Sequence, residues 1–93
     1  MSLVQDANRK LKQLGIDGEI QRSSRPNKKL MLLTASGKRI HFGAKGSHTF
    51  LEGATNQKKQ AYRARHSKIK LADGRLAHKV RNTPAYLSWN ILW

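Results

Sequence analysis

The fold depends most on residues 29–42, which read KLMLLTASGKRIHF. From Lys29 to Thr34 the chain holds four consecutive apolar residues, a pattern typical of a central strand that is covered on both faces. A turn follows at residues 35–37. From Lys38 to Phe42, apolar residues then alternate with Arg39 and His41, as in a strand with one packed face and one cationic face. The stretch therefore predicts an antiparallel hairpin.

The residues before the hairpin predict one more strand and a helix. A strand of about residues 19–23 and a turn through Ser24-Arg25-Pro26-Asn27 complete a three-stranded meander over residues 18–43. Within a neutral segment, residues 1–17, residues 2–14 predict an amphipathic helix. Ser2 and Gln5 have the spacing of a capping box, and Gly15 is well placed to end the helix. Its apolar side chains share one face: Leu3, Val4, Ala7, Leu11 and Leu14.

Residues 55–70 predict a basic helix, capped by Thr55 or Asn56. We expect its packing stripe to consist of Ala61, Tyr62, Arg65 and Ile69. Within that stripe, the sequence predicts that the Arg65 guanidinium pairs with Glu52, Asp73 or carbonyl oxygens. A second stripe, at i, i+4, i+7 and i+11 spacing, carries Lys59, Arg63, His66 and Lys70. Like charges at this spacing repel one another, and a bound polyanion would reverse that effect.

The last eleven residues, 83–93, are the most apolar part of the chain and include both Trp residues. Thr83 as a cap and Pro84 at the first position favour a short helix. Alternation of Leu87, Trp89, Ile91 and Trp93 fits a strand as well. With residues 43–53 as a loop and residues 71–82 irregular, the expected fold class is α+β. We expect an N-terminal helix, a three-stranded meander and one or two C-terminal helices in a single small basic domain, residues 1–93.

The charge of the chain indicates a polyanionic partner. Of the 93 residues, 19 are Lys or Arg and five are Asp or Glu, which gives a net charge of +14. Residues 1–20 are neutral overall, while residues 21–93 hold sixteen of the basic residues and only two acids. Such self-repulsion is relieved when a polyanion binds. A basic face that is merely solvated is the alternative.

The residues expected to contact nucleic acid are the cationic strand position, a glycine-rich loop and the helix stripe: Arg39, Lys45, Lys59, Arg63, His66 and Lys70. Two readings of Arg39 stay open, because edge strands also carry cations that discourage pairing with other strands. The loop around Lys45, Gly43-Ala44-Lys45-Gly46, lacks the ending of a P-loop, so turn geometry is the better explanation for its glycines.

Catalytic and metal chemistry is not indicated. The chain has no Cys, and its His residues, His41, His48, His66 and His78, are not at metal-ligand spacing. No pair of acids or nucleophile motif supports a reaction. We therefore expect no enzyme activity, no cofactor, no metal, no small-molecule substrate and no membrane span.

Residues 39–93 resemble a family of small basic proteins encoded by large double-stranded DNA viruses of algae and other eukaryotes. Three segments carry the resemblance: RIHFGAKG at 39–46, YRARH at 62–66 and TPAYLSWNILW at 83–93. They match an Arg-x-x-Phe-Gly strand end, a Tyr-x-x-Arg-His helix and a closing Trp-rich segment. Residues 67–82 lack the Trp that family members often carry there. The resemblance implies a viral setting and no mechanism.

These observations together predict a non-enzymatic virion protein, either a minor capsid component or a link between capsid and DNA. We expect it in the virion, and in the host cytoplasm or nucleus during assembly. Its partners would be double-stranded DNA, bound without sequence preference, and viral capsid proteins contacted through Tyr86, Trp89 and Trp93. The alternative is a nonspecific DNA- or RNA-binding protein of viral replication, transcription or packaging. A ribosomal-type RNA-binding protein is a third reading.

Overall fold

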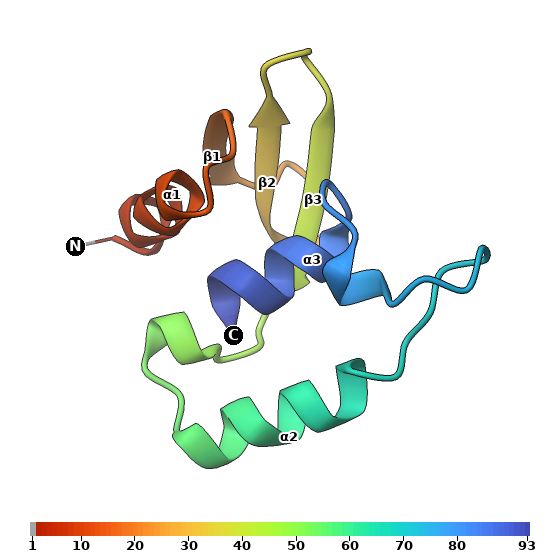
Figure 1. The fold of residues 1–93 in the computed structure, drawn as a ribbon. Coiled ribbons are helices and arrows are strands. Elements are labelled where there is room, and N and C mark those ends of the chain that lie inside the picture. Colours follow the sequence, from red (N-terminus) through yellow and green to blue (C-terminus); the bar gives the residue numbers. More distant parts are fainter. Residues whose placement is uncertain (1) are drawn as a thin grey trace. The chain divides into compact units, whose positions relative to one another are not determined.

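The computed structural model describes residues 2–93 and confirms the α+β class (Figure 1). The elements follow one another as α1 (Leu3–Gln13), β1 (Gly18–Arg22), β2 (Lys28–Thr34), β3 (Arg39–Ala44), η1 (Phe50–Glu52), α2 (Asn56–His66), η2 (Ala77–Lys79), α3 (Pro84–Leu87) and η3 (Ser88–Leu92). They fall into two compact units, Met1–Ser47 (unit 1) and His48–Trp93 (unit 2). Each unit is described by itself, and the single domain stays a prediction.

Helix α1 begins as its sequence predicts. The Ser2 hydroxyl accepts a hydrogen bond from the Gln5 backbone at 3.2 Å, and the Gln5 side chain accepts one from the Ser2 backbone at 3.0 Å. This capping box satisfies two N–H groups that lack partners inside the helix. Ala7 and Leu11 face inward and are at most 1% exposed.

The three strands form an antiparallel meander in the order β1-β2-β3. Strand β2 is central and Leu30, Met31 and Leu32 are all buried, as the unbroken apolar run predicts. Ile20, Leu32 and Ile40 lie opposite one another across the strands and so share one face. Strand β3 runs to Ala44, two residues beyond the expected end at Phe42.

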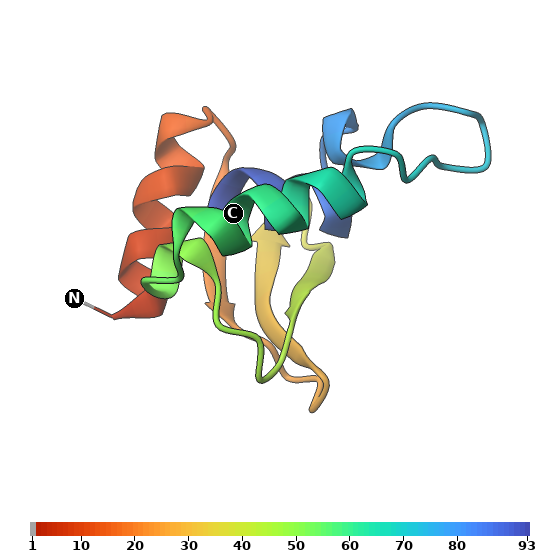
Figure 2. The ribbon, with the colours of Figure 1, turned by 90° about the horizontal axis from the view of Figure 1, so that it is seen from below.

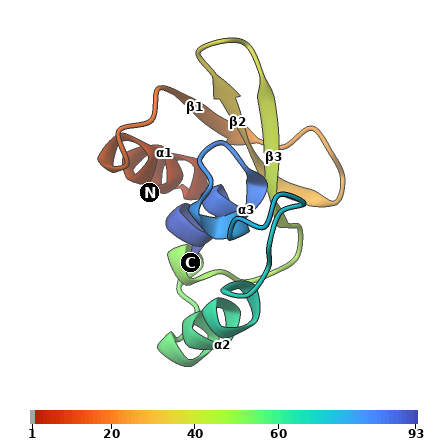
Figure 3. The same ribbon diagram turned by 45° about the vertical axis from the view of Figure 1, so that its right-hand side comes forward.

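A side chain of α1 holds the outer edge of the sheet in unit 1. The Asn8 amide donates to the Ile20 carbonyl at 2.9 Å, and its oxygen accepts from the Ile20 N–H at 2.8 Å. An edge strand exposes such backbone groups, and Asn8 satisfies them as a neighbouring strand would. Figures 1 and 3 show α1 alongside β1.

Unit 2 is helical. Helix α2 begins at Asn56 with Thr55 as its cap and ends at His66, four residues earlier than expected (Figure 2). The loop that follows is closed by a bridge between Lys70 and Leu76, with Asp73 at its turn. The 3₁₀ turns η1 and η2 occupy segments expected to be irregular.

The C-terminal segment is helical, which settles the choice between helix and strand. The Thr83 hydroxyl accepts from the Tyr86 backbone at 3.2 Å, and Pro84 occupies the first turn. Helix α3 continues into the π-helical turn η3, in which the Trp93 N–H donates to the Ser88 carbonyl at 3.0 Å.

Candidate nucleic-acid interface

The predicted contact residues are divided between the two units. Arg39 and Lys45 lie in unit 1, while Lys59, Arg63, His66 and Lys70 lie in unit 2. Their part in binding stays a prediction, and the structure shows the surroundings of each.

In unit 1, the register of the meander puts Arg39 and His41 on the sheet face opposite to Ile40. On this face His41 lies across from Met31, and Arg39 across from Leu33. Arg39 is exposed and His41 is half-buried. The alternation predicted for this strand is therefore present, with one packed face and one cationic face.

His41 is held by a turn residue that the sequence analysis did not select. Its Nδ1 lies 2.7 Å from the Ser23 hydroxyl, which also accepts the Arg25 N–H at 3.0 Å. The pKa of the imidazole is lowered, first by partial burial and then by the positive charges of Arg25, Arg39 and Lys28. The charge of the turn was visible in the sequence, but its closeness to His41 depends on strand register.

The loop after β3 ends beside the same turn. The Lys45 backbone N–H donates to the Asn27 carbonyl at 3.2 Å, and the Lys45 side chain is exposed. Gly43 and Gly46 have φ angles of 81° and 91°, a region that favours glycine. Turn geometry thus explains both glycines, as expected.

In unit 2, the packing face predicted for α2 is wrong. Ala61 and Arg65 are exposed, and Ile69, which lies beyond the helix, is 46% exposed. Only Tyr62 of that stripe is buried. Among residues 2–93, no hydrogen bond or ion pair joins the Arg65 guanidinium to Glu52, Asp73 or a carbonyl oxygen.

The predicted cationic stripe of α2 is instead its inner face. The Lys59 ammonium lies 4.4 Å from the centre of the Phe50 ring, and the Arg63 guanidinium 4.8 Å from that of Trp89. Such cation–π contacts stabilise a partly desolvated cation. Arg63 also donates from Nη2 to the Trp93 carbonyl at 3.3 Å, while its Nε is buried without a partner. Lys70, the fourth member, lies outside the helix and is exposed.

Rings stack around the same face. Tyr62 stacks on His66 at 4.0 Å and on Trp93 at 4.6 Å, between ring centres. Burial raises the pKa of the Tyr62 phenol. The pKa of His66 is lowered, first by burial and then by the Arg65 charge. A second stack joins His78 to Trp89 at 3.9 Å. The C-terminal rings therefore pack inside unit 2.

The residues predicted to form a protein interface are only partly exposed to solvent. Tyr86, Trp89 and Trp93 are each half-buried. Leu87, Ile91 and Leu92, the neighbouring large apolar residues of this segment, are at most 1% exposed. Docking on a capsid protein stays a prediction.

The exposed cations of unit 2 lie outside the inner face of α2. On α2 and the loop after it, they are Lys58, Arg65, Lys68, Lys70 and Arg75. None of these except Lys70 was selected from the sequence, because the helix face was assigned wrongly.

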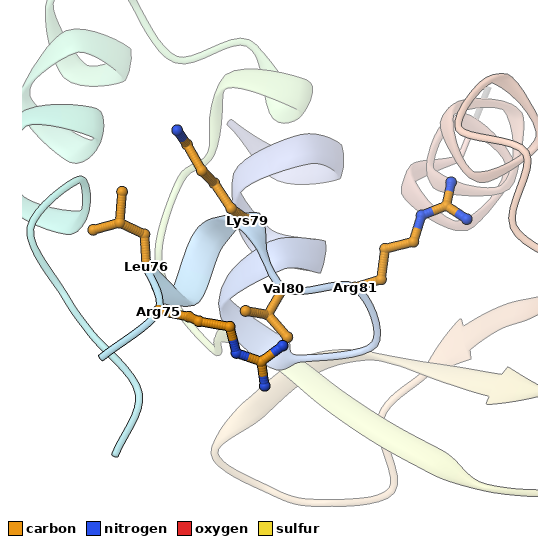
Figure 4. A pocket seen from close by; sticks show the side chains of 5 residues that line it. All are labelled: Arg75, Leu76, Lys79, Val80 and Arg81. Carbon is orange, nitrogen blue, oxygen red and sulfur yellow. The ribbon is translucent and has the colours of Figure 1, made fainter. Parts of the chain in front are cut away.

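An open pocket of about 380 Å³ adds to this basic surface, and it is lined by Arg75, Leu76, Lys79, Val80 and Arg81. Figure 4 shows the side chains of Lys79 and Arg81 pointing away from one another. Arg75 is paired with Asp73, 2.6 Å away, and hydrogen bonds from Arg75 hold the pKa of that carboxyl below its usual value. Three basic and two apolar residues thus line the pocket.

Residues 2–93 contain no group of three His, Cys, Asp or Glu side chains that could hold a metal ion. No helix among these residues is both long and apolar enough to cross a membrane.

Comparison with known proteins identifies a family for this chain, but the matching proteins have no described activity. A protein of Acanthamoeba polyphaga mimivirus, a large DNA virus, described as uncharacterized protein L851, is 33% identical over 81 residues, which cover 83% of this chain and 81% of the viral protein. No solved structure matches the chain. The model of a family of unknown function (DUF5754) matches residues 18–66, which include the Arg39–Gly43 and Tyr62–His66 motifs. The chain belongs to this family.

Proposed function

We propose that this chain is a non-enzymatic virion protein that binds the viral genome through its basic surface, as a minor capsid component or a link between capsid and DNA. The observation that carries the proposal is the net charge of +14, of which much is displayed on two surfaces. Unit 1 has a cationic sheet face, and unit 2 exposes cations on the outer side of α2 and in the loop after it. The similarity to a mimivirus protein supports the viral setting.

Phosphate backbones are the ligand that fits such surfaces. Contacts from Lys and Arg to phosphates give affinity without sequence preference, because every nucleotide presents the same charge. The rings that could stack on unpaired bases are largely used inside unit 2. This favours duplex DNA over single-stranded RNA, which proteins bind by stacking bases on exposed aromatics.

A nonspecific DNA- or RNA-binding protein of replication, transcription or packaging is the second candidate. It is favoured by the burial of Leu87, Ile91 and Leu92, since a capsid component needs a surface for its neighbour. Mass spectrometry of purified particles separates the two. A constant copy number per particle supports a structural component, and absence from particles supports the second candidate.

Binding itself is tested by fluorescence anisotropy with two labelled duplexes of equal length and unrelated sequence. We expect equal affinity for both duplexes, and weak competition by poly-glutamate, whose charge density is lower. Strong preference for one duplex would contradict nonspecific binding. Displacement of DNA by poly-glutamate at equal charge concentration would point to an acidic protein surface as the partner.

A further inference from the structure

Four polar or charged residues of unit 1 act on the His41 imidazole, and together with His41 we call them the His41 cluster: Ser23, Arg25, Lys28 and Arg39. They come from the segment between β1 and β2, the start of β2 and strand β3. Three of them are cations that act electrostatically on the ring.

The hydrogen bond with Ser23 occupies one nitrogen of the His41 ring. The Ser23 hydroxyl oxygen accepts the Arg25 N–H at 3.0 Å, lies 2.7 Å from the His41 Nδ1 and has a second lone pair, so it can also accept from the Nδ1–H of the protonated ring. The imidazolium then carries its second N–H at Nε2. The structure gives Nε2 no hydrogen-bond partner among residues 2–93. This N–H is therefore a donor available to an anion.

The charges on this sheet face favour an anion as well. Glu19 is an acid on the same face, but it lies on β1, opposite Leu33, and is two strands away from His41. Two strand spacings separate β1 from β3 by about 9–10 Å. Arg39 lies on the same strand and the same face as His41, two residues away, so it is closer to His41 than Glu19 is.

We infer that the His41 cluster binds one phosphate group, which accepts a hydrogen bond from the His41 Nε2–H on the sheet face that also carries Arg39. Arg25 in the neighbouring turn and Lys28 add to the positive potential there. This inference rests on the proposed function and names the place at which unit 1 would contact the nucleic-acid backbone. A single phosphate suits the cluster because it offers one oriented donor surrounded by unspecific positive charge.

The test is an NMR pH titration of the histidine rings in the whole chain, free, with inorganic phosphate and with a short DNA duplex. A bound anion favours the imidazolium, so we expect the pKa of His41 to rise by about 1 unit. A pKa of His41 that does not rise with either probe would overturn the site.

Two variants of equal charge change sharpen the result. Arg39→Gln removes an exposed cation of the cluster, and Lys12→Gln removes an exposed cation of α1. We expect Arg39→Gln to reduce the His41 shift and Lys12→Gln to leave it, with unchanged backbone spectra in both. If both variants reduced the His41 shift equally, general electrostatic attraction would explain the shift, and the inference of a site at His41 would be overturned. If DNA binds without the His41 shift, only this inference fails; if phosphate alone produces the shift and DNA does not bind, only the proposed function fails.

Discussion

Asn8 shows how one polar side chain positions the sheet of unit 1. It joins α1 to both backbone groups of Ile20 and also donates to the Val4 carbonyl at 3.0 Å. Nothing in the local sequence distinguishes Asn8 from a polar residue on the outer face of a helix. Its role depends on a strand twelve residues away, so it could not be predicted from periodicity.

Replacing Asn8→Ala should lower the free energy of unfolding by about 1–3 kcal/mol, because Ile20 is fully buried and loses the partners of its N–H and carbonyl. Hydrogen exchange of the Ile20 amide should accelerate more than that of other β1 amides. Asn90→Ala is the control, since the Asn90 amide donates only to the Tyr86 carbonyl four residues earlier. Equal losses in the two variants would contradict the role given to Asn8.

His66 makes the stability of unit 2 depend on pH. The folded-state pKa is lowered below the ordinary value of 6.5, so the unfolded chain binds the proton more readily. The stabilisation is therefore complete above pH 6.5 and is lost as the pH falls from 6.5 through the folded-state pKa. Tryptophan fluorescence follows this directly, because both Trp residues lie in unit 2.

We expect the unfolding midpoint to fall between about pH 7.5 and pH 5, and His66→Gln to flatten that dependence. His48→Gln, which changes an exposed ring, should keep it. A midpoint that rises on acidification would show that the sign is wrong.

At the scale of elements, local signals predicted α1 and the three strands to within a few residues, whereas they left the C-terminal segment open between helix and strand. Their caps, turns and apolar runs are complete within the segments themselves. Helix α2 is different, because apart from Tyr62 its only apolar residues are alanines, Ala61 and Ala64. On the helical wheel Tyr62 lies between the two predicted stripes, so its position alone does not decide which stripe faces inward. The face was set by rings near the C-terminus, about thirty residues away, and the local pattern does not contain that information.

Two double variants, each of which removes two positive charges from one face of α2, test the roles of the two faces. Lys59→Gln with Arg63→Gln removes both cation–π contacts and should destabilise unit 2 by about 1–3 kcal/mol, measured by Trp fluorescence. Lys58→Gln with Arg65→Gln changes exposed cations and should leave stability nearly unchanged.

The outer variant should instead weaken DNA binding. If both cations contact phosphates, the slope of log K against log salt should become shallower by about 1.8. Loss of stability in the outer variant with none in the inner one would reverse the assignment of the faces.

At the scale of the whole molecule, charge is the property that the sequence predicts most directly, since it needs no knowledge of packing. Which cations are exposed required the structure: three of the six residues chosen from sequence, Lys59, Arg63 and His66, are half-buried on the inner face of α2. Arg39, Lys45 and Lys70 are exposed. The proposed polyanion-binding surface therefore includes more of the basic residues than any one motif contains.

The salt dependence of duplex binding tests most directly the claim that the chain binds DNA through phosphate contacts of its basic surface. If the chain neutralises about six to ten phosphates, its affinity should fall by about 10³- to 10⁵-fold between 50 and 200 mM salt, with equal slopes for unrelated duplexes. An affinity that barely changes over this range would contradict a partner bound through its phosphates.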